Sequence, residues 1–238
     1  PTWPVQPPGG RINGARIEGA LDLTGCSGDR LPALALTACE IPQPVNVSAA
    51  HLSALSFTGS RLAQIDADAA RLDGDLDLAG SAPLGAPGHE TLIVCARGLR
   101  VDGAINANGA KLARAIDAQD FALMLDDADI TGGVSLDGEF ESFGGVSLAH
   151  ARIGGVLSLN GAQVLNRTDA NGAPALAANG ARIRAVLMEE KCHLEGAADF
   201  SGADIAGDIR ISHGSFRNEG ALALAVANAR IGGDIHAY

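Results

Sequence analysis

Three aspartates at alternate positions, Asp73, Asp75 and Asp77, have the spacing in this sequence that most directly suggests chemistry. Alternate side chains of an extended strand project to the same side, so the sequence predicts a row of three carboxylates on one face. Such a row could bind Ca²⁺ or perform acid–base work on a polysaccharide. A solvated outer face gives the same pattern, and the aromatic residues that usually accompany sugar sites are only 3% of the chain. The row is therefore a candidate metal site beside the simpler interpretation of a polar surface.

Other reactive residues lack the spacing of a catalytic or metal motif. The six histidines are not at ligand spacing, and the four cysteines are far apart with no CxxC pair, which indicates buried free thiols. Glu189 falls at the repeat position that holds Leu159 and Ile211 in neighbouring repeats. A buried carboxylate there would be a candidate site, but we expect a local bulge that turns it outward. No dinucleotide, P-loop or haem-attachment motif occurs, so no catalytic residue is assigned.

A set of charged residues recurs directly after the alanine that opens each repeat. The mixed signs on neighbouring coils predict an outward ladder stabilised by ion pairs. The alternative is an anion-binding stripe that includes Arg152 and Arg182. The members of the ladder are Arg71, Asp129, Arg152, Arg182, Asp204 and Arg230.

A repeat of about 11 residues must position all of these side chains. Its clearest copy is ARIGGVLSLNG at residues 151–161, and related copies begin at positions 15, 70, 128, 203 and 229. Apolar and polar residues alternate with period two, which is typical of short strands with one buried face. Glycine recurs where each strand should end and the chain must bend. No long segment has the helical period, so almost no helix is expected.

A fixed period of this kind predicts a solenoid, because one unit cannot bury its apolar face alone. Two units make a coil of 22 residues, and coils about 4.8 Å apart give a rod of about nine coils and roughly 40 Å. We therefore predict an all-β fold, a single-stranded parallel β-helix with a right-handed turn, over residues 11–238. Residues 1–10, with four prolines and Trp3, are expected to form a leader or N-terminal cap.

Several coils are longer than 22 residues. The excess lies in residues 162–174, in 213–220 and near 110–122; all three follow the same strand, so these loops are expected at one edge of the rod. A fourth interruption, 81–91, cannot be placed from the sequence. Loops on repeat scaffolds often carry function. The candidate interaction residues are His89, Arg167, Asp169, His213 and Arg217.

Composition excludes some partners. The net charge of −11 argues against direct binding to nucleic acid or to an anionic membrane. No apolar run approaches the ~20 residues that span a bilayer, and no signal peptide is visible, which favours the cytoplasm without excluding a removed leader. The 31 glycines and few aromatics suit a narrow interior with many corners.

The repeats resemble those of long β-helical proteins of high-GC bacteria built from GARIGGDLDLSGA units. ARLDGDLDLAG at 70–80 and ARIGGVLSLNG at 151–161 carry the resemblance, which covers most of residues 11–238. Such proteins are often labelled membrane-associated oxidoreductases, but the shared motif is structural and implies no catalytic residue. The chain also distantly resembles pentapeptide-repeat proteins, with their four-sided coil, although the five-residue unit is not kept.

The first hypothesis for function is a non-enzymatic scaffold that recognises a protein partner or associates with itself. Because the chain stops in mid-strand at 235–238, we expect further coils, or an edge that docks on a partner or a second copy. Two alternatives remain: a polysaccharide-acting or Ca²⁺-binding β-helix that uses the aspartate row, and an acidic mimic of DNA.

Overall fold

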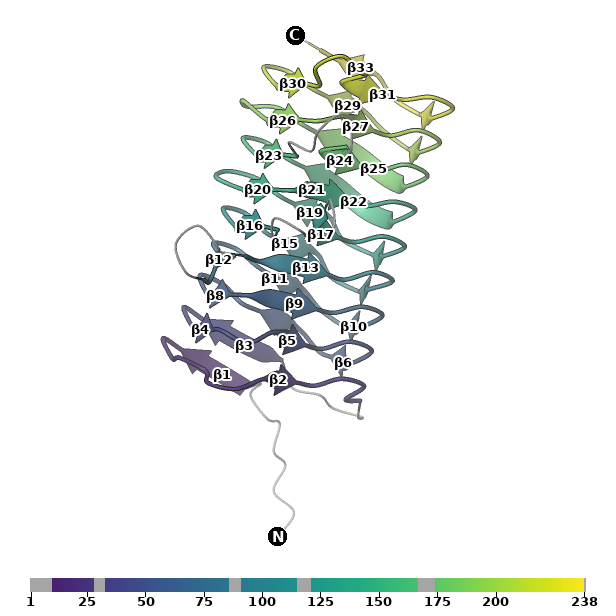
Figure 1. The fold of residues 1–238 in the computed structure, drawn as a ribbon. Coiled ribbons are helices and arrows are strands. Elements are labelled where there is room, and N and C mark those ends of the chain that lie inside the picture. The colour runs from purple at the N-terminus through teal and green to yellow at the C-terminus, as the bar shows by residue number, and fades with distance from the viewer. Residues whose placement is uncertain (1–9, 28–32, 86–90, 115–120, 167–173, 238) are drawn as a thin grey trace.

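The chain folds as a parallel β-helix in which short strands stack into four faces (Figure 1). The computed structural model describes residues 10–27, 33–85, 91–114, 121–166 and 174–237. Those residues contain no helix. The chain rises from the N-terminal to the C-terminal end and visits face I, face II, face III and face IV in that order within each coil. The predicted all-β solenoid is therefore confirmed.

Face I is a sheet of nine parallel strands. Each strand contributes one inward aliphatic residue, beginning with Leu21 and Val45, and one outward residue that is mostly polar. The strands are β2 (Leu21–Asp22), β5 (Val45–Asn46), β9 (Gln64–Asp66), β13 (Ile93–Cys95), β17 (Phe121–Met124), β21 (Gly145–Ser147), β24 (Leu176–Ala177), β27 (Ala198–Asp199) and β31 (Leu224–Ala225).

Face II follows face I in each coil and carries the predicted charged ladder. Its two longest strands continue around the corner into face III, so the two faces form one sheet. The strands are β6 (His51–Leu52), β10 (Arg71–Leu72), β14 (Arg100–Val101), β18 (Asp129–Ile130), the first parts of β22 (Arg152–Ser158) and β25 (Arg182–Leu187), β28 (Asp204–Ile205) and β32 (Arg230–Ile231).

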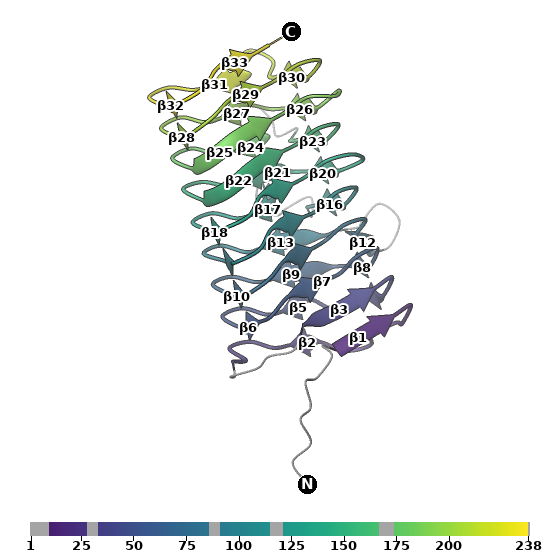
Figure 2. The same ribbon diagram turned by 180° about the vertical axis from the view of Figure 1, so that it is seen from behind.

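Face III contains the second parts of β22 and β25, which Figure 2 shows as broad continuous arrows. Its other strands are β1 (Gly10–Asn13), β3 (Leu34–Thr37), β7 (Leu55–Ser56), β11 (Leu76–Asp77), β15 (Ile105–Asn106), β19 (Val134–Ser135), β29 (Ile209–Arg210) and β33 (Ile235–His236).

Face IV forms the column of strands along the left of Figure 1 and closes each coil. It consists of a three-stranded and a five-stranded sheet. The strands are β4 (Glu40–Ile41), β8 (Arg61–Leu62), β12 (Ala82–Pro83), β16 (Lys111–Ala113), β20 (Glu141–Phe143), β23 (Gln163–Leu165), β26 (His193–Glu195) and β30 (Ser215–Arg217).

The strand register confirms the predicted coil length. Ile183 pairs with Ile205, 22 positions later, and Ile130 pairs with Ile153, 23 positions later. Each 11-residue unit supplies two short strands on adjacent faces, so a coil has four sides. Gly10 already belongs to β1, and residues 1–9, including Trp3, lie outside the described residues.

The four interruptions considered in the sequence analysis all lie between face IV and face I. The interruptions follow β12, β16, β23 and β30 and precede β13, β17, β24 and β31. The prediction of one common edge is therefore correct, and it extends to the interruption at 81–91. The excess near the C-terminal end was predicted too broadly, because Ser215–Arg217 form the regular strand β30.

One narrow core runs the length of the rod. It consists of Leu, Ile, Val and Ala stacked in register, with Phe57, Phe140 and Phe200 as its largest fully buried side chains. Phe140 is flanked by small side chains, because Ala110 and Ala162 occupy its position in the coils below and above, whereas Phe57 stacks between Leu36 and Leu78. These stacked side chains fill the interior without a helix or a second layer.

Candidate functional site

The three aspartates predicted to form a row are distributed around a corner of the coil. Asp73 directly follows β10 on face II, Asp75 lies at the corner, and Asp77 belongs to β11 on face III. The predicted row on one face is wrong, because the strand ends before Gly74 and the chain turns there. Each carboxylate consequently has different partners.

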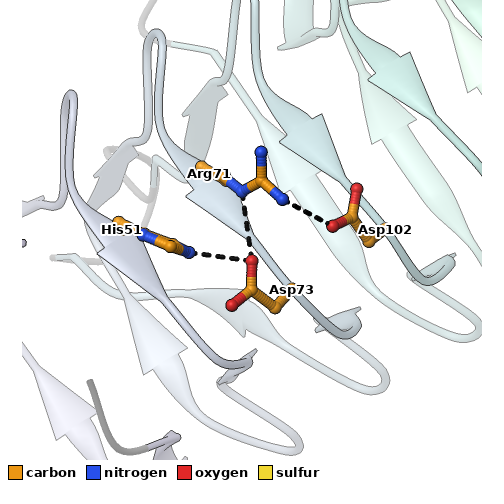
Figure 3. Close-up of polar contacts among 4 residues, drawn as sticks. All are labelled: His51, Arg71, Asp73 and Asp102. Atoms are coloured by element: carbon orange, nitrogen blue, oxygen red, sulfur yellow. Dashed lines mark hydrogen bonds and ion pairs between the residues drawn. The ribbon is translucent and has the colours of Figure 1, made fainter. Parts of the chain in front are cut away.

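Asp73 is part of a charged cluster on face II (Figure 3). Its Oδ1 accepts a hydrogen bond from Arg71 Nε at 3.1 Å and lies 2.8 Å from His51 Nε2. Arg71 Nη2 also donates to Asp102 Oδ2 at 2.8 Å, one coil further on. The hydrogen bond with His51, followed by that with Arg71, lowers the pKa of Asp73. The cluster links three successive coils and leaves its carboxylates occupied.

This arrangement predicts an unusually acidic Asp73. Its pKa should lie below the ordinary 3.8, so its charged form stabilises the fold above pH 3.8, and this contribution is lost as the pH falls through the lowered pKa. An NMR titration of the carboxyl carbons measures the midpoint. In H51Q the midpoint should rise, because the largest cause of the lowering is removed. A midpoint at or above 3.8 in the wild type would contradict the cluster.

Asp75 connects its corner of the coil to the next coil through a hydrogen bond. Its Oδ1 accepts a hydrogen bond from the backbone N–H of Ala104 at 2.8 Å. The carboxylate packs over Gly103, where an added Cβ would lie only 2.2 Å from Oδ1. Asp208 repeats this geometry, accepting from the N–H of Asp234 at 3.1 Å. The Gly-Asp pair of the repeat is thus a structural connection between coils.

Asp77 is also used within the fold. It accepts hydrogen bonds from Thr58 Oγ1 at 3.0 Å, from the N–H of Ala79 at 3.0 Å and from Asn106 Nδ2 at 3.2 Å. Within the described part of the chain, no three His, Cys, Asp or Glu side chains form a group that could hold a metal ion. The structure therefore does not bring Asp73, Asp75 and Asp77 together as a joint set of ligands.

The predicted charged ladder exists on face II, but the ion pairs predicted between its members do not form among the described residues, and Arg71 pairs instead with Asp73 and Asp102. Strand pairing places its members in one column and adds two residues that the sequence analysis missed, His51 and Arg100. The next outward position forms a second column. In chain order that column contains Asp73 and Asp102, and then Thr131, Gly154, Arg184 and Ala206.

Three arginines on β22 and β25 lie together on this face: Arg152, Arg182 and Arg184, all of them exposed. They border a shallow hollow of about 490 Å³ that also contacts Asp129, Gly154 and Asp204. A second hollow of about 360 Å³ shares Arg184 and continues toward Arg210. Unlike Arg71, none of the three arginines forms an ion pair with another described residue. We call them the arginine face.

Two of the predicted interaction residues have a described environment. His213 adopts a left-handed backbone conformation (φ 56°) in the corner turn between β29 and β30, where most other coils have glycine, so it is not in an insertion. Arg217 lies on β30 and pairs with Glu219 at 3.3 Å. The other three, His89, Arg167 and Asp169, lie outside the described residues.

Glu189 is half-buried, and the register explains why it does not enter the core. Val186 pairs with Leu157, so Met188, buried at 0% exposure, takes the position of Leu159. The alignment that places Glu189 at the position of Leu159 is displaced by one residue, because an irregularity between Ile153 and Val156 absorbs the additional residue of β22. Glu189 therefore points away from the core without the bulge that was predicted for it.

The four cysteines are free, but only two of them are buried. Cys39 and Cys192 lie in the core, Cys95 is intermediate and Cys26 is exposed. Burial raises the pKa of the Cys192 thiol to about 12 and also raises that of Cys95. The prediction of buried free thiols is thus correct for two of the four.

Reaction with Ellman's reagent should follow this order. At pH 8 the native protein should expose one fast thiol, Cys26, and a slower one, Cys95, whereas Cys39 and Cys192 should react only after unfolding. C26S should remove the fast phase alone. Rapid modification of four thiols in the native protein would contradict the described core.

Comparison with known proteins adds no family. No family model matches the chain, and no curated protein matches it. A search of the described residues finds no helix long and apolar enough to cross a membrane.

Proposed function

We propose that this protein is a non-enzymatic β-helical scaffold that recognises another protein through its lateral surface. Solenoids offer long, rigid faces on which recognition residues can be changed without touching the core. The resemblance to β-helical repeat proteins of high-GC bacteria agrees with this proposal, because the motif they share is structural.

The observation that carries the proposal is that outward polar side chains form hydrogen bonds from one coil to the next. On face III, Asp137 accepts hydrogen bonds from Ser135 and Ser158 hydroxyls at 2.7 and 2.5 Å and from the N–H of Asn160 at 2.8 Å. On face I, Asp68 accepts from the N–H of Arg97 at 2.7 Å. Asp137 and Asp68, like Asp73, Asp75 and Asp77, are engaged in hydrogen bonds between coils, whereas a hydrolase would need a free acid and base.

The two alternative functions have weaker support. A polysaccharide-acting or Ca²⁺-binding site at Asp73, Asp75 and Asp77 would need them to converge, whereas they lie on both sides of a corner. A mimic of DNA would need a continuous negative stripe, and the arginine face interrupts face II. A partner protein, or a second copy of this chain, accounts better for such a surface.

The test compares baits that differ on one face only. The wild type, R152Q/R182Q/R184Q on face II and R61Q/K111Q/R217Q on face IV carry the same tag, and both variants lower the net charge by the same three units. Captured proteins are quantified by mass spectrometry, and each candidate is then purified and titrated against each bait. Light scattering across a concentration series tests the second copy as partner.

If the protein is a recognition scaffold, one variant should weaken the affinity for a purified partner, or for a second copy, at least about tenfold. The other variant should leave that affinity within about twofold of the wild type. Circular dichroism should confirm that both variants are folded. The proposal would be overturned if no partner distinguished the two faces and the protein kept the mass of a monomer at every concentration.

A further inference from the structure

We propose that the arginine face, Arg152, Arg182 and Arg184, binds a short acidic segment of a partner protein through carboxylate side chains. This inference rests on the proposed function and names the chemistry of the recognised partner. Four features of face II carry it: arginines without ion-pair partners, the pairing of like charges, the shape of the hollow, and the residues at its ends and floor.

The first feature is that the arginines of β22 and β25 lack the ion-pair partners that Arg71 has on the same face. Further toward the N-terminal end, Arg71 contacts Asp73 at 3.1 Å and Asp102 at 2.8 Å. On β22 and β25 the position equivalent to these aspartates holds Gly154 and Arg184. The negative charge that neutralises Arg71 is therefore absent at this position of β22 and β25. Gly154 has no side chain there, and Arg184 adds a further positive charge.

The second feature is the pairing of like charges on neighbouring coils. Arg152 and Arg182 are direct partners in a parallel ladder, and like charges opposite one another destabilise a sheet. On their other sides Arg152 has Asp129 and Arg182 has Asp204 as ladder partner. Among the described residues, however, no carboxylate forms an ion pair with any of the three arginines, as Asp73 and Asp102 do with Arg71. An anion placed between Arg152 and Arg182 would relieve this repulsion, and a guanidinium can bind a carboxylate through two parallel hydrogen bonds.

The third feature is the shape of the surface. Where other coils turn sharply between faces II and III, β22 and β25 continue through the corner, and Gly154 contributes no side chain. The hollow extends across β18, β22, β25 and β28. At about 4.8 Å per coil this is roughly 14 Å, the length of about four extended residues.

The ends and floor of the hollow favour a peptide over other anions. Asp129 and Asp204 stand at its two ends and would repel a long polyanion, as would the net charge of −11. The residues that line it include isoleucine, alanine and glycine but no aromatic residue on which a base or a sugar could stack. A segment with two or three carboxylates among small apolar side chains matches both the charge and the lining.

Fluorescence anisotropy with a labelled heptapeptide of alternating glutamate and leucine tests this inference on the intact chain. The matched probe has glutamine in place of glutamate, and inorganic phosphate and a short single-stranded DNA serve as competitors. Glutamate peptide should bind in 50 mM salt, at least about tenfold more tightly than the glutamine peptide. R152Q/R182Q/R184Q should weaken binding at least about tenfold, and R61Q/K111Q/R217Q, with the same net charge, less than twofold.

A second readout does not depend on the variants. The Nε–Hε signals of Arg152, Arg182 and Arg184 should shift on addition of the glutamate peptide and stay in place with the glutamine peptide. Equal binding by both triple variants, or unchanged arginine signals, would overturn the inference. Displacement of the peptide by phosphate or DNA at lower concentration than by unlabelled peptide would also overturn it, since the face would then select a phosphate.

Failure here is distinguishable from failure of the scaffold function. If the peptide does not bind but the capture experiment yields a face-dependent partner, the acidic segment is wrong and the scaffold stands. If the peptide binds at the arginines while capture and light scattering yield no protein partner, the arginine face binds carboxylates and the scaffold function is wrong.

Discussion

Replacing Phe140 with alanine should destabilise the protein by about 3–5 kcal/mol, the usual cost of removing a fully buried phenylalanine. Phe140 has no exposed surface, and the same position holds Ala110 in the coil below and Ala162 in the coil above. The variant would stack three alanines in succession and leave a cavity that the rigid sheets around it cannot close.

Urea unfolding followed by circular dichroism measures this loss. F143A is the matched control, because Phe143 lies only three residues away, at the end of β20, but is 55% exposed. The control should change the free energy of unfolding by less than about 1 kcal/mol. Equal effects of F140A and F143A would contradict the narrow, close-packed interior.

Replacing Gly155 with alanine should destabilise the protein by about 3 kcal/mol through overpacking between coils. An added Cβ would lie 2.6 Å from the backbone nitrogen of Gly133 and 2.8 Å from the carbonyl carbon of Gly132. These are main-chain atoms of the coil below, and Gly155 N–H donates to the Gly132 carbonyl at 2.8 Å. Separating the two coils would break that hydrogen bond, so the strain cannot be relieved by a side-chain movement.

G10A provides the comparison for this variant in the same unfolding assay. Gly10 is exposed, and a Cβ there would meet only Leu34 Cδ1 at an ordinary 3.7 Å. G10A should therefore leave stability within about 0.5 kcal/mol of the wild type. If G155A were as harmless as G10A, the close contact between β22 and the coil below would be wrong.

The fold could be predicted from the sequence because its signal is repeated many times. Inward residues such as Ile130, Ile153, Ile183 and Ile205 recur at spacings that a stack of coils requires, and glycines mark the corners. The repeat nevertheless predicts the wrong register at one place, between β22 and β25. The repeat places Glu189 at the position of Leu159, and only the three-dimensional pairing shows that β22 accommodates one more residue than β25.

The candidate site was predicted less well, because it depends on corners and on contacts between coils. Asp73, Asp75 and Asp77 alternate like residues of one strand, but Gly74 allows a corner between them. That glycine was the available signal. Arg152 and Arg182 were recognised as an alternative anion site, whereas Arg184 was missed. Its position two residues after Arg182 predicts the same face once the ladder is known.

The most direct measurement of the central claim is calorimetric unfolding of the wild type and D73N/D75N/D77N, each in Ca²⁺ and in a chelator. If these aspartates hold coils together in a scaffold, the wild type should unfold at the same temperature in both buffers. The variant should unfold at a lower temperature by an equal amount in each. A wild-type Tm that rises in Ca²⁺, with the rise absent from the variant, would contradict the account and assign the aspartates to a metal site.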